Sequence, residues 1–353
     1  MSSYKSIINK LEFPKIACFD LDYTLIKPKS GKKFPVDKND WEWLYPNVPD
    51  KLKEYYENKY TIIIFTNQKK LKNLDDFIYK ILMIESKLSI PINIFISLEN
   101  DYYRKPHTGM FDKLLTLTNI DMTHSFYCGD AAGRNTDFSN SDRLFAHNCN
   151  LTFILPEHYF LNHNLILPDL PINPLTNYIS TKDEDYEIIQ KINKYLENND
   201  NIGIINIGAP ASGKSFFTNS LMNLNNTFHK FSNDEIKNKK KLLSTLKKSL
   251  QNNHNIIIDN TNPDIITRKI FIDLCKEYNY KIIFCWFNLP LEISKFLNQY
   301  RTQIGKPNIP ALVYNIYKKK FEIPSITEGV DEIIEIKNIF SLYQKNPMFK
   351  YLF

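Results

Sequence analysis

Two acidic residues stand two positions apart, directly after an apolar stretch near the start of the chain. The segment reads CFDLDYT, and Asp20 and Asp22 follow the run KIACF, which is typical of a buried strand. A carboxylate can attack phosphorus once a cation screens the phosphate charge, so Asp20 could accept a phosphoryl group. Asp22 could protonate the leaving oxygen and then deprotonate water. The pair predicts removal of a phosphate through an aspartyl intermediate.

Three further polar residues follow in an order that suits the same chemistry. Thr66 ends the run YTIIIF, Lys105 lies in YRKPHTGM, and Asp130 comes two residues after SFYC. A hydroxyl and an ammonium group can bind the equatorial oxygens of a phosphoryl group. Mg²⁺ usually takes one or two protein carboxylates together with phosphate and water. We expect the ligands of this ion among Asp20, Asp22 and Asp130.

A motif of the opposite kind lies beyond the middle of the chain. The segment GAPASGKS matches G-x-x-x-x-G-K-[ST], follows the strand-like run IGIINI and precedes a helical pattern at 216–224. In such a loop backbone N–H groups cradle the phosphates, the lysine neutralises them and the serine reaches Mg²⁺. We expect ATP to bind here, at Gly208, Ala209, Pro210, Ala211, Ser212, Gly213, Lys214 and Ser215.

Two acidic residues after this loop extend the second site. Asp234 follows Lys214 by twenty residues, where P-loop kinases place the carboxylate that activates the acceptor. On spacing alone, Asp234 could equally be a helix cap. Asp259 ends the strand-like run IIID, a position that often serves Mg²⁺ or the acceptor.

The elements that carry these residues follow a parallel α/β pattern. Short apolar runs alternate with helical patterns, and the polar residues come just after strand ends, where open α/β sheets bind ligands. We expect strands at 15–19, 60–65, 92–96, 125–128, 201–208, 255–260 and 280–287. Three prolines in 168–174 interrupt the pattern and indicate a linker. The predicted domains are 1–170 and 183–353, joined by a linker at 171–182.

Size and composition are those of a globular protein. With 353 residues the chain is long enough for two domains, and its net charge of +6 suits an anionic partner or any soluble basic protein. The five cysteines form no C-x-x-C pair, so we expect small buried hydrophobic residues in a reducing compartment. The N-terminus lacks the apolar core of a signal peptide, and no run is long enough to span a membrane. We expect a soluble intracellular protein.

The first half of the chain resembles the haloacid-dehalogenase superfamily of phosphatases. The stretches FDLDYTLIKPKSGKKFP, FTNQ, YRKPHTGM and GDAAGR, followed by DFSNSDRLFAHN, are similar to the phosphatase domain of the eukaryotic polynucleotide kinase 3′-phosphatases. One departure is Tyr23, where that family usually has glycine. His107 in the third stretch is given no catalytic role.

The second half resembles the kinase domain of the same family in IDNTNPD and IPALVYNIYKKKFEIPSITEG. The resemblance implies that Asp234 is the general base and that Arg301 is a lid arginine over the transferring phosphate. Asn233 departs from the arginine expected of animal members. Arg268 is expected on a helix surface, facing the acceptor strand.

The resemblance implies a fold of two parallel-sheet α/β domains, a haloacid-dehalogenase-like phosphatase followed by a P-loop kinase. This is the eukaryotic order, and no forkhead-associated domain is expected before the first strand, which about fourteen residues precede. The implied function is to remove 3′-phosphates and to phosphorylate 5′-hydroxyls with ATP and Mg²⁺, so that DNA breaks can be ligated.

Two other functions remain open: RNA end repair, and a metabolite phosphatase fused to a nucleoside kinase. The short spacer from Asp22 to Thr66 leaves no room for a cap domain over a small substrate, which favours a polymer end. We expect a monomer located in the nucleus or, for a viral protein, in the infected-cell cytoplasm or the virion.

Overall fold

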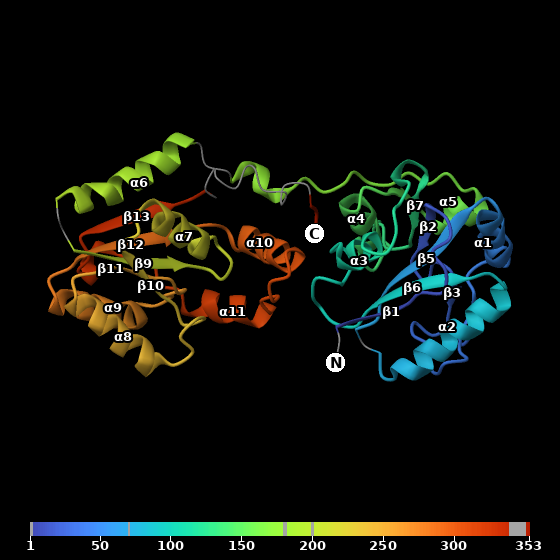
Figure 1. Ribbon diagram of the computed structural model, residues 1–353, viewed down its shortest axis with the longest axis horizontal. Coiled ribbons are helices and arrows are strands. Elements are labelled where there is room, and N and C mark those ends of the chain that lie inside the picture. Colours follow the sequence, from blue (N-terminus) through green and yellow to red (C-terminus); the bar gives the residue numbers. More distant parts are fainter. Residues whose placement is uncertain (1–2, 70, 179–181, 199–200, 339–350) are drawn as a thin grey trace. The chain divides into compact units, whose positions relative to one another are not determined.

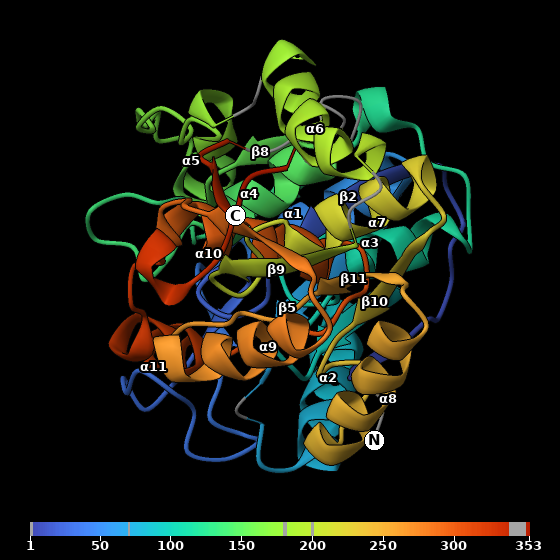
Figure 2. The ribbon, with the colours of Figure 1, turned by 90° about the vertical axis from the view of Figure 1, so that its left-hand side faces the viewer.

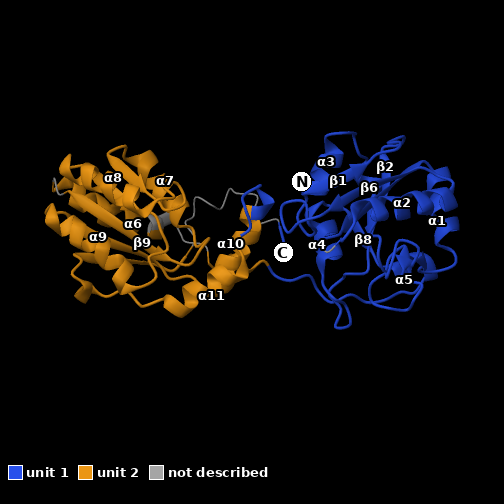
Figure 3. Ribbon diagram, turned by 90° about the horizontal axis from the view of Figure 1, so that it is seen from below, with its two compact units in different colours: residues 1–172, 302–308, 350–353 blue, residues 173–301, 309–349 orange. Residues whose placement is uncertain are grey.

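The chain divides into two units, each built around a sheet of its own (Figure 3). The structure is a computed structural model that describes residues 3–69, 71–178, 182–198, 201–338 and 351–353. Unit 1 comprises Met1–Ile172, Thr302–Asn308 and Lys350–Phe353, and unit 2 comprises Asn173–Arg301 and Ile309–Phe349. The domain boundaries drawn from the sequence stay predictions, and residues 179–181 of the expected linker lie outside the described residues.

Unit 1 contains a six-stranded sheet in the order β1-β6-β5-β2-β7-β8. Strands β2, β5, β6, β7 and β8 run parallel, as the sequence predicts, while β1 pairs antiparallel with β6 at the edge. The sequence prediction missed β1 and was wrong that the first strand begins near residue 15, because YKSI has no apolar run. The strands are β1 Tyr4–Ile7, β2 Lys15–Phe19, β5 Tyr60–Asn67, β6 Ile92–Ser97, β7 Phe126–Cys128 and β8 Thr152–Ile154; β3 Ile26–Lys27 and β4 Glu42–Trp43 form a separate pair.

Helices cover both faces of this sheet (Figure 1). Leu52 of α1 and Phe77 of α2 pack on the face formed by Ala17 and Phe19 of β2. Phe111 of α3 and Phe145 of α4 pack on the opposite face. Successive strand residues point to opposite faces, so β2 contributes to both cores and is buried throughout its centre. The helices are α1 Val48–Glu57, α2 Leu74–Leu88, α3 Gly109–Leu115, α4 Ser141–Asn148 and α5 Pro156–Leu161.

Unit 2 contains a parallel five-stranded sheet in the order β10-β11-β9-β12-β13. Helices α6 and α7 lie on one face, and α8 and α9 lie on the other (Figures 1 and 2). The strands are β9 Ile202–Gly208, β10 Phe228–Phe231, β11 Asn255–Ile258, β12 Lys281–Phe287 and β13 Glu332–Ile336. The helices are α6 Lys182–Glu197, α7 Lys214–Leu224, α8 Lys239–Gln251, α9 Ile265–Glu277, α10 Leu291–Gln303 and α11 Ala311–Lys320. The predicted α/β class with parallel sheets is confirmed.

The strand registers bring the chemical residues to one edge of each sheet. In unit 1, the last residue of β2, Phe19, pairs with Ile64 of β5 and with Cys128 of β7, so Asp20 emerges between these strands. In unit 2, Gly208 at the end of β9 pairs with Phe287 of β12. Among the described residues, no helix is both long enough and apolar enough to cross a membrane.

Candidate active sites

Lys105 lies at the centre of the site in unit 1. Its ammonium group is buried and lies 2.6 Å from Asp20 Oδ1 and 2.7 Å from Asp142 Oδ1. It also donates to the main-chain oxygen of Phe65 at 2.8 Å and to the hydroxyl of Tyr127 at 2.8 Å. The lysine therefore holds the predicted nucleophile by a charge-assisted hydrogen bond, the strong kind in a buried setting.

Three carboxylates crowd around this single cation. One oxygen from each of Asp20, Asp130 and Asp142 lies within 4.8 Å of the others. Burial raises the pKa of Asp20 well above its usual value; Lys105 opposes this, while Asp142 and Asp130 add to it. Burial raises the pKa of Asp130 to about 7, with the Asp142 carboxylate adding to the effect. The cluster thus holds more negative charge than one ammonium group can balance.

This donor set fits a magnesium ion. Three carboxylates and one ammonium leave two negative charges, which a divalent cation would neutralise, and carboxylate oxygens are the ligands that Mg²⁺ prefers. Asp20 and Asp130 were both expected from the sequence. Asp22, the third expected ligand, is not a member of this cluster, and Asp142 occupies its place there.

Asp22 and Thr66 share a hydrogen-bond partner that the sequence argument did not single out. The side-chain amide of Gln68 donates to Asp22 Oδ2 at 2.7 Å and to Thr66 Oγ1 at 2.8 Å. The Asp22 side chain is 38 % exposed, and its Oδ1 lies 3.9 Å from Lys80 Nζ. Gln68 directly follows the end of β5, the position that marked the other site residues, and could have been found by the same rule. The structure thus brings Asp22 and Thr66 to one shared amide group, with Asp22 on the more exposed side and Thr66 buried.

Asp142 reaches the cluster from the first turn of α4. Its Oδ2 accepts the backbone N–H of Ala131 at 3.0 Å, and it is buried. A Cβ atom on Gly129 would lie 2.6 Å from Asp142 Cβ, so only glycine allows α4 to approach the end of β7 this closely. The stretch GDAAGR needs its first glycine for this reason.

The turn after Asp20 contains a conformation that L-residues rarely adopt. Tyr23, which departs from the glycine usual in the family, has a φ of +59°, in the left-handed region that glycine enters without a steric penalty. Its hydroxyl donates to the main-chain oxygen of Lys33 at 2.8 Å, which ties the turn to the following loop. The next residue, Thr24, accepts the backbone N–H of Asp130 at 3.1 Å.

In unit 2 the predicted phosphate loop joins β9 to α7. Gly213 has a φ of +95° and precedes the helix, and a Cβ on Gly208 would lie 2.8 Å from Phe287 Cβ. Lys214 bends back over the loop and donates to the main-chain oxygens of Gly208 at 3.1 Å and Ala209 at 2.6 Å. The loop thus has the glycines and the folded-back lysine that a phosphate cradle requires.

The remaining predicted residues of this site all influence the pKa of Lys214. Burial lowers the pKa of Lys214 to about 8, Asp259 and Asp234 act in the opposite direction, and Arg301 adds to the lowering. All three therefore act on the same ammonium group. A bound phosphate would keep this lysine fully protonated, because its negative charge would offset the cost of burying the ammonium group.

Asp234 lies in a turn and caps no helix. It follows β10, its backbone N–H donates to Ser232 Oγ at 3.2 Å, and its side chain is exposed. Helix α8 begins at Lys239 and is capped by Asn238, whose side chain accepts the backbone N–H of Lys241. The helix-cap alternative is therefore wrong, and the general-base role stays a proposal.

Asp259 directly follows β11 and is buried among polar side chains. Its Oδ1 accepts from the Asn206 amide at 3.4 Å, and its Oδ2 lies 3.5 Å from Lys230 Nζ. The Asn206 Oδ1 atom and the Asn262 Oδ1 atom are buried without a hydrogen-bond partner. The unsatisfied oxygen of Asn206, whose amide nitrogen contacts Asp259, fits a hydrated Mg²⁺ ion, whose water ligands donate hydrogen bonds.

The expectation for Arg268 was wrong. Its side chain is fully buried and forms a two-pronged ion pair with Glu328, at 2.7 Å and 2.8 Å. It also donates to the main-chain oxygens of Asn262, Pro263 and Glu322. The helix pattern placed it outward, but these carbonyls turn it inward. Arg268 therefore stabilises the loop after β11 and cannot face an acceptor strand.

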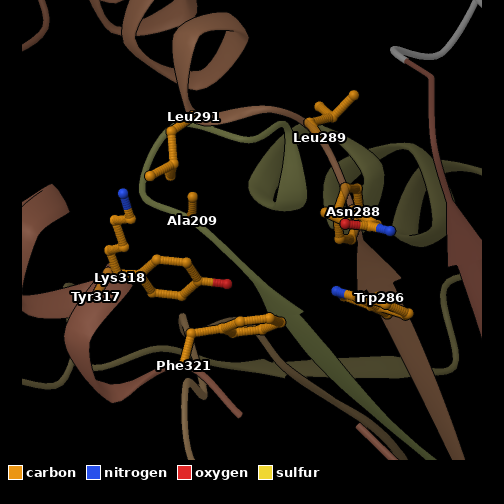
Figure 4. A pocket seen from close by; sticks show the side chains of 9 residues that line it. Ala209, Trp286, Asn288, Leu289, Leu291, Tyr317, Lys318 and Phe321 are labelled. Atoms are coloured by element: carbon orange, nitrogen blue, oxygen red, sulfur yellow. The ribbon is translucent and has the colours of Figure 1, made fainter. Parts of the chain in front are cut away.

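A cavity opens beside the start of the phosphate loop (Figure 4). Ala209 forms part of its wall, together with the aromatic side chains of Trp286, Tyr317 and Phe321. Flat apolar surface beside a phosphate loop suits a nucleobase, which can stack on aromatic rings.

The comparisons with known proteins cover both halves of the chain. Residues 15–160 match the family model "Polynucleotide kinase 3 phosphatase". The chain is 32% identical to a bifunctional polynucleotide phosphatase/kinase of Schizosaccharomyces pombe over 91% of this chain and 79% of the relative. It is 34% identical to a putative bifunctional polynucleotide phosphatase/kinase of Acanthamoeba polyphaga mimivirus, over 94% of this chain and 87% of the relative.

The chain belongs to the bifunctional polynucleotide phosphatase/kinase family. Within the phosphatase part, it is also 36% identical to a polynucleotide 3′-phosphatase of Arabidopsis thaliana, over 42% of this chain and 24% of that relative. The resemblance noted in the sequence is thereby confirmed for both halves.

Proposed function

We propose that this family member heals broken DNA ends by removing 3′-phosphates in unit 1 and phosphorylating 5′-hydroxyls with ATP in unit 2. The observation that carries the proposal is that each unit brings together charged groups that suit phosphate chemistry. Unit 1 has a carboxylate bonded to a buried lysine, and unit 2 has a phosphate loop with acidic residues beside it. The two chemistries together yield the 3′-hydroxyl and 5′-phosphate that a ligase requires.

In unit 1, Asp20 attacks the phosphorus of the 3′-phosphate, and the bond to the 3′ oxygen breaks. Asp22, on the more exposed side of the site, gives that oxygen a proton and later takes one from the water that hydrolyses the aspartyl phosphate. Lys105 and Thr66 bind the equatorial oxygens. Mg²⁺ held by Asp20, Asp130 and Asp142 would supply positive charge against the phosphate.

In unit 2, the loop at 208–215 binds the phosphates of ATP through its backbone N–H groups and Lys214. Asp234 takes the proton from the 5′-hydroxyl as its oxygen bonds to the γ-phosphorus, and ADP leaves. Arg301 stabilises the transferring group. Ser215 and Asp259 would hold the Mg²⁺ ion, which adds positive charge beside the phosphates.

A surface beside the first site favours a polymer over a small metabolite. The Lys33 ammonium lies 5.9 Å from the ring centre of Phe34 and 5.8 Å from that of Phe138. The two phenylalanines are 64 % and 84 % exposed. Exposed rings with a lysine between them can stack bases and attract their backbone. A phosphorylated metabolite without bases could not stack on these rings.

We further propose that the protein acts as a monomer inside the cell. All five cysteines are buried, as the sequence predicts for a protein of a reducing compartment.

One substrate panel tests the function. A nicked DNA duplex with 3′-phosphate and 5′-hydroxyl ends, single-stranded DNA, RNA with the same ends and a 3′-mononucleotide are each assayed at two salt concentrations. We expect the DNA substrates to be turned over fastest, with affinity falling steeply as salt rises, because binding of backbone phosphates releases counterions.

Each other outcome has a defined meaning. Mononucleotides turned over as well as DNA, without salt dependence, would replace the proposal by a metabolite enzyme. Faster turnover of RNA would keep both reactions and move them to RNA repair.

A further inference from the structure

Tyr127 places a hydroxyl group inside the lysine cluster of unit 1. It is the central residue of β7, and it is fully buried. Its oxygen lies 2.8 Å from Lys105 Nζ and 2.9 Å from Asp142 Oδ1. Nothing in the sequence argument indicated it, because SFYC reads as an ordinary buried strand.

The hydrogen bonds around Lys105 are overcommitted. An ammonium group has three N–H donors, yet four acceptors lie within 2.8 Å of it: Asp20 Oδ1, the Phe65 carbonyl, the Tyr127 hydroxyl and Asp142 Oδ1. The tyrosine has one proton, and its only carboxylate partner in the described cluster is Asp142. It therefore donates to Asp142 and accepts from Lys105.

This arrangement decides which N–H group can move. The Phe65 carbonyl is fixed in β5, and Asp142 is fixed by the backbone N–H of Ala131. The Phe65 carbonyl and the Tyr127 hydroxyl then take one N–H group each, which leaves the third N–H group shared between Asp142 and Asp20. This shared N–H group lies beside the attacking carboxylate, where a phosphoryl group must arrive.

We propose that Tyr127 is a positioning residue for the 3′-phosphatase reaction, holding Lys105 so that the N–H group shared with Asp20 is the one that turns to a phosphoryl oxygen. The inference rests on the proposed function of unit 1. It assigns Tyr127 no contact with the substrate and no proton transfer.

Tyr127→Phe separates this role from packing. The ring of Tyr127 packs edge-on against Phe145, and the variant keeps that ring and removes only the hydroxyl. Tyr159→Phe is the matched control, because Tyr159 is a buried tyrosine of the same unit and its hydroxyl makes no hydrogen bond to Lys105 or Asp142 among the described contacts. Both variants are measured at a temperature at which circular dichroism shows them folded.

We expect Tyr127→Phe to lower kcat for 3′-phosphate removal roughly 10- to 100-fold, the usual size of a loss of catalytic positioning, with KM changed by less than about threefold. Tyr159→Phe should leave kcat within about twofold, and both variants should keep the kinase activity. In an Asp142→Asn background, Tyr127→Phe should cost much less, because the two groups act on the same lysine.

The proposal is overturned if kcat of Tyr127→Phe stays within twofold of the wild type, if only KM rises, or if Tyr159→Phe causes an equal loss. A wild-type protein without any 3′-phosphatase activity would instead refute the proposed function of unit 1. The two failures are therefore distinguishable in one series.

Discussion

The carboxylate of Asp142 lies 2.7 Å from the Lys105 ammonium, and the two side chains come from positions 37 residues apart. Both are almost fully buried, so neither charge is hydrated, and each depends on the other. This pair connects the end of β7 and helix α4 to the predicted nucleophile, since Lys105 also bonds Asp20. The phosphatase site is thus a network and not a set of separate residues.

Asp142→Asn should disrupt this network. We expect phosphatase kcat to fall by roughly two orders of magnitude or more, because the variant loses a candidate metal ligand and one of the charges that hold Lys105. The kinase activity of the same preparation should persist. Asp121→Asn, which alters a partly exposed carboxylate of unit 1, is the control. Equal losses of phosphatase kcat in both variants would contradict a specific role of Asp142 in the site.

Asp130 should make the stability of the ion-free protein depend on pH. Its pKa of about 7 in the folded protein lies far above the usual value of 3.8, so the folded state binds this proton more tightly. That contribution to stability is complete at low pH and is lost as pH rises through 7. Mg²⁺, which replaces the proton, should therefore raise the Tm more at pH 8 than at pH 6. Asp130→Asn should remove most of this difference, and an unchanged difference would contradict the assignment.

Asp234→Asn should separate catalysis from nucleotide binding. The side chain is exposed in a turn, so the fold should not change. We expect the dissociation constant for ATP to stay within about threefold and kinase turnover to fall by roughly two to four orders of magnitude. Isothermal titration beside steady-state rates decides between the roles. A variant that only weakens ATP binding would make Asp234 a nucleotide contact.

Arg268→Met should lower the free energy of unfolding of unit 2, because it breaks a buried ion pair. Removing one partner of a buried ion pair costs about 3–5 kcal/mol, because Glu328 is left buried and unpaired. Lys269→Met, one residue along, removes an exposed partner of Asp273 and should cost less than about 1 kcal/mol. Urea unfolding of both variants provides the comparison. Equal stabilities, with acceptor binding lost in Arg268→Met, would restore the surface role expected from the sequence.

Site residues that come just after strands could be predicted from the sequence alone. Asp20, Asp130 and Asp259 each come after a short apolar run, and parallel strands bring such positions to one edge. Phosphate binding by the loop at 208–215 could be predicted as well, because the glycines and the lysine of this loop have a fixed spacing.

Residues that reach the sites from inside a helix or strand could not be found in this way. Asp142 and Arg268 look like the outward-facing charges of ordinary helices, and Tyr127 looks like a core residue. Their roles depend on which backbone groups and charges meet them in three dimensions. A charged residue in a helix becomes informative only when its burial is known.

Two independent sites in one chain should perform opposite phosphate chemistry on one break. The most direct measurement follows a nicked duplex with 3′-phosphate and 5′-hydroxyl ends, labelled on both strands of the nick, in the presence of ATP, Mg²⁺ and a DNA ligase. Asp20→Asn should yield nicks with both a 3′-phosphate and a 5′-phosphate, and Lys214→Ala should yield nicks with two hydroxyls.

Neither variant alone should support ligation, whereas an equal mixture of the two should restore it, because each supplies the site that the other lacks. If either folded variant loses both reactions, or if the mixture leaves the nick open although each variant keeps its own reaction, the account of two independent sites is contradicted.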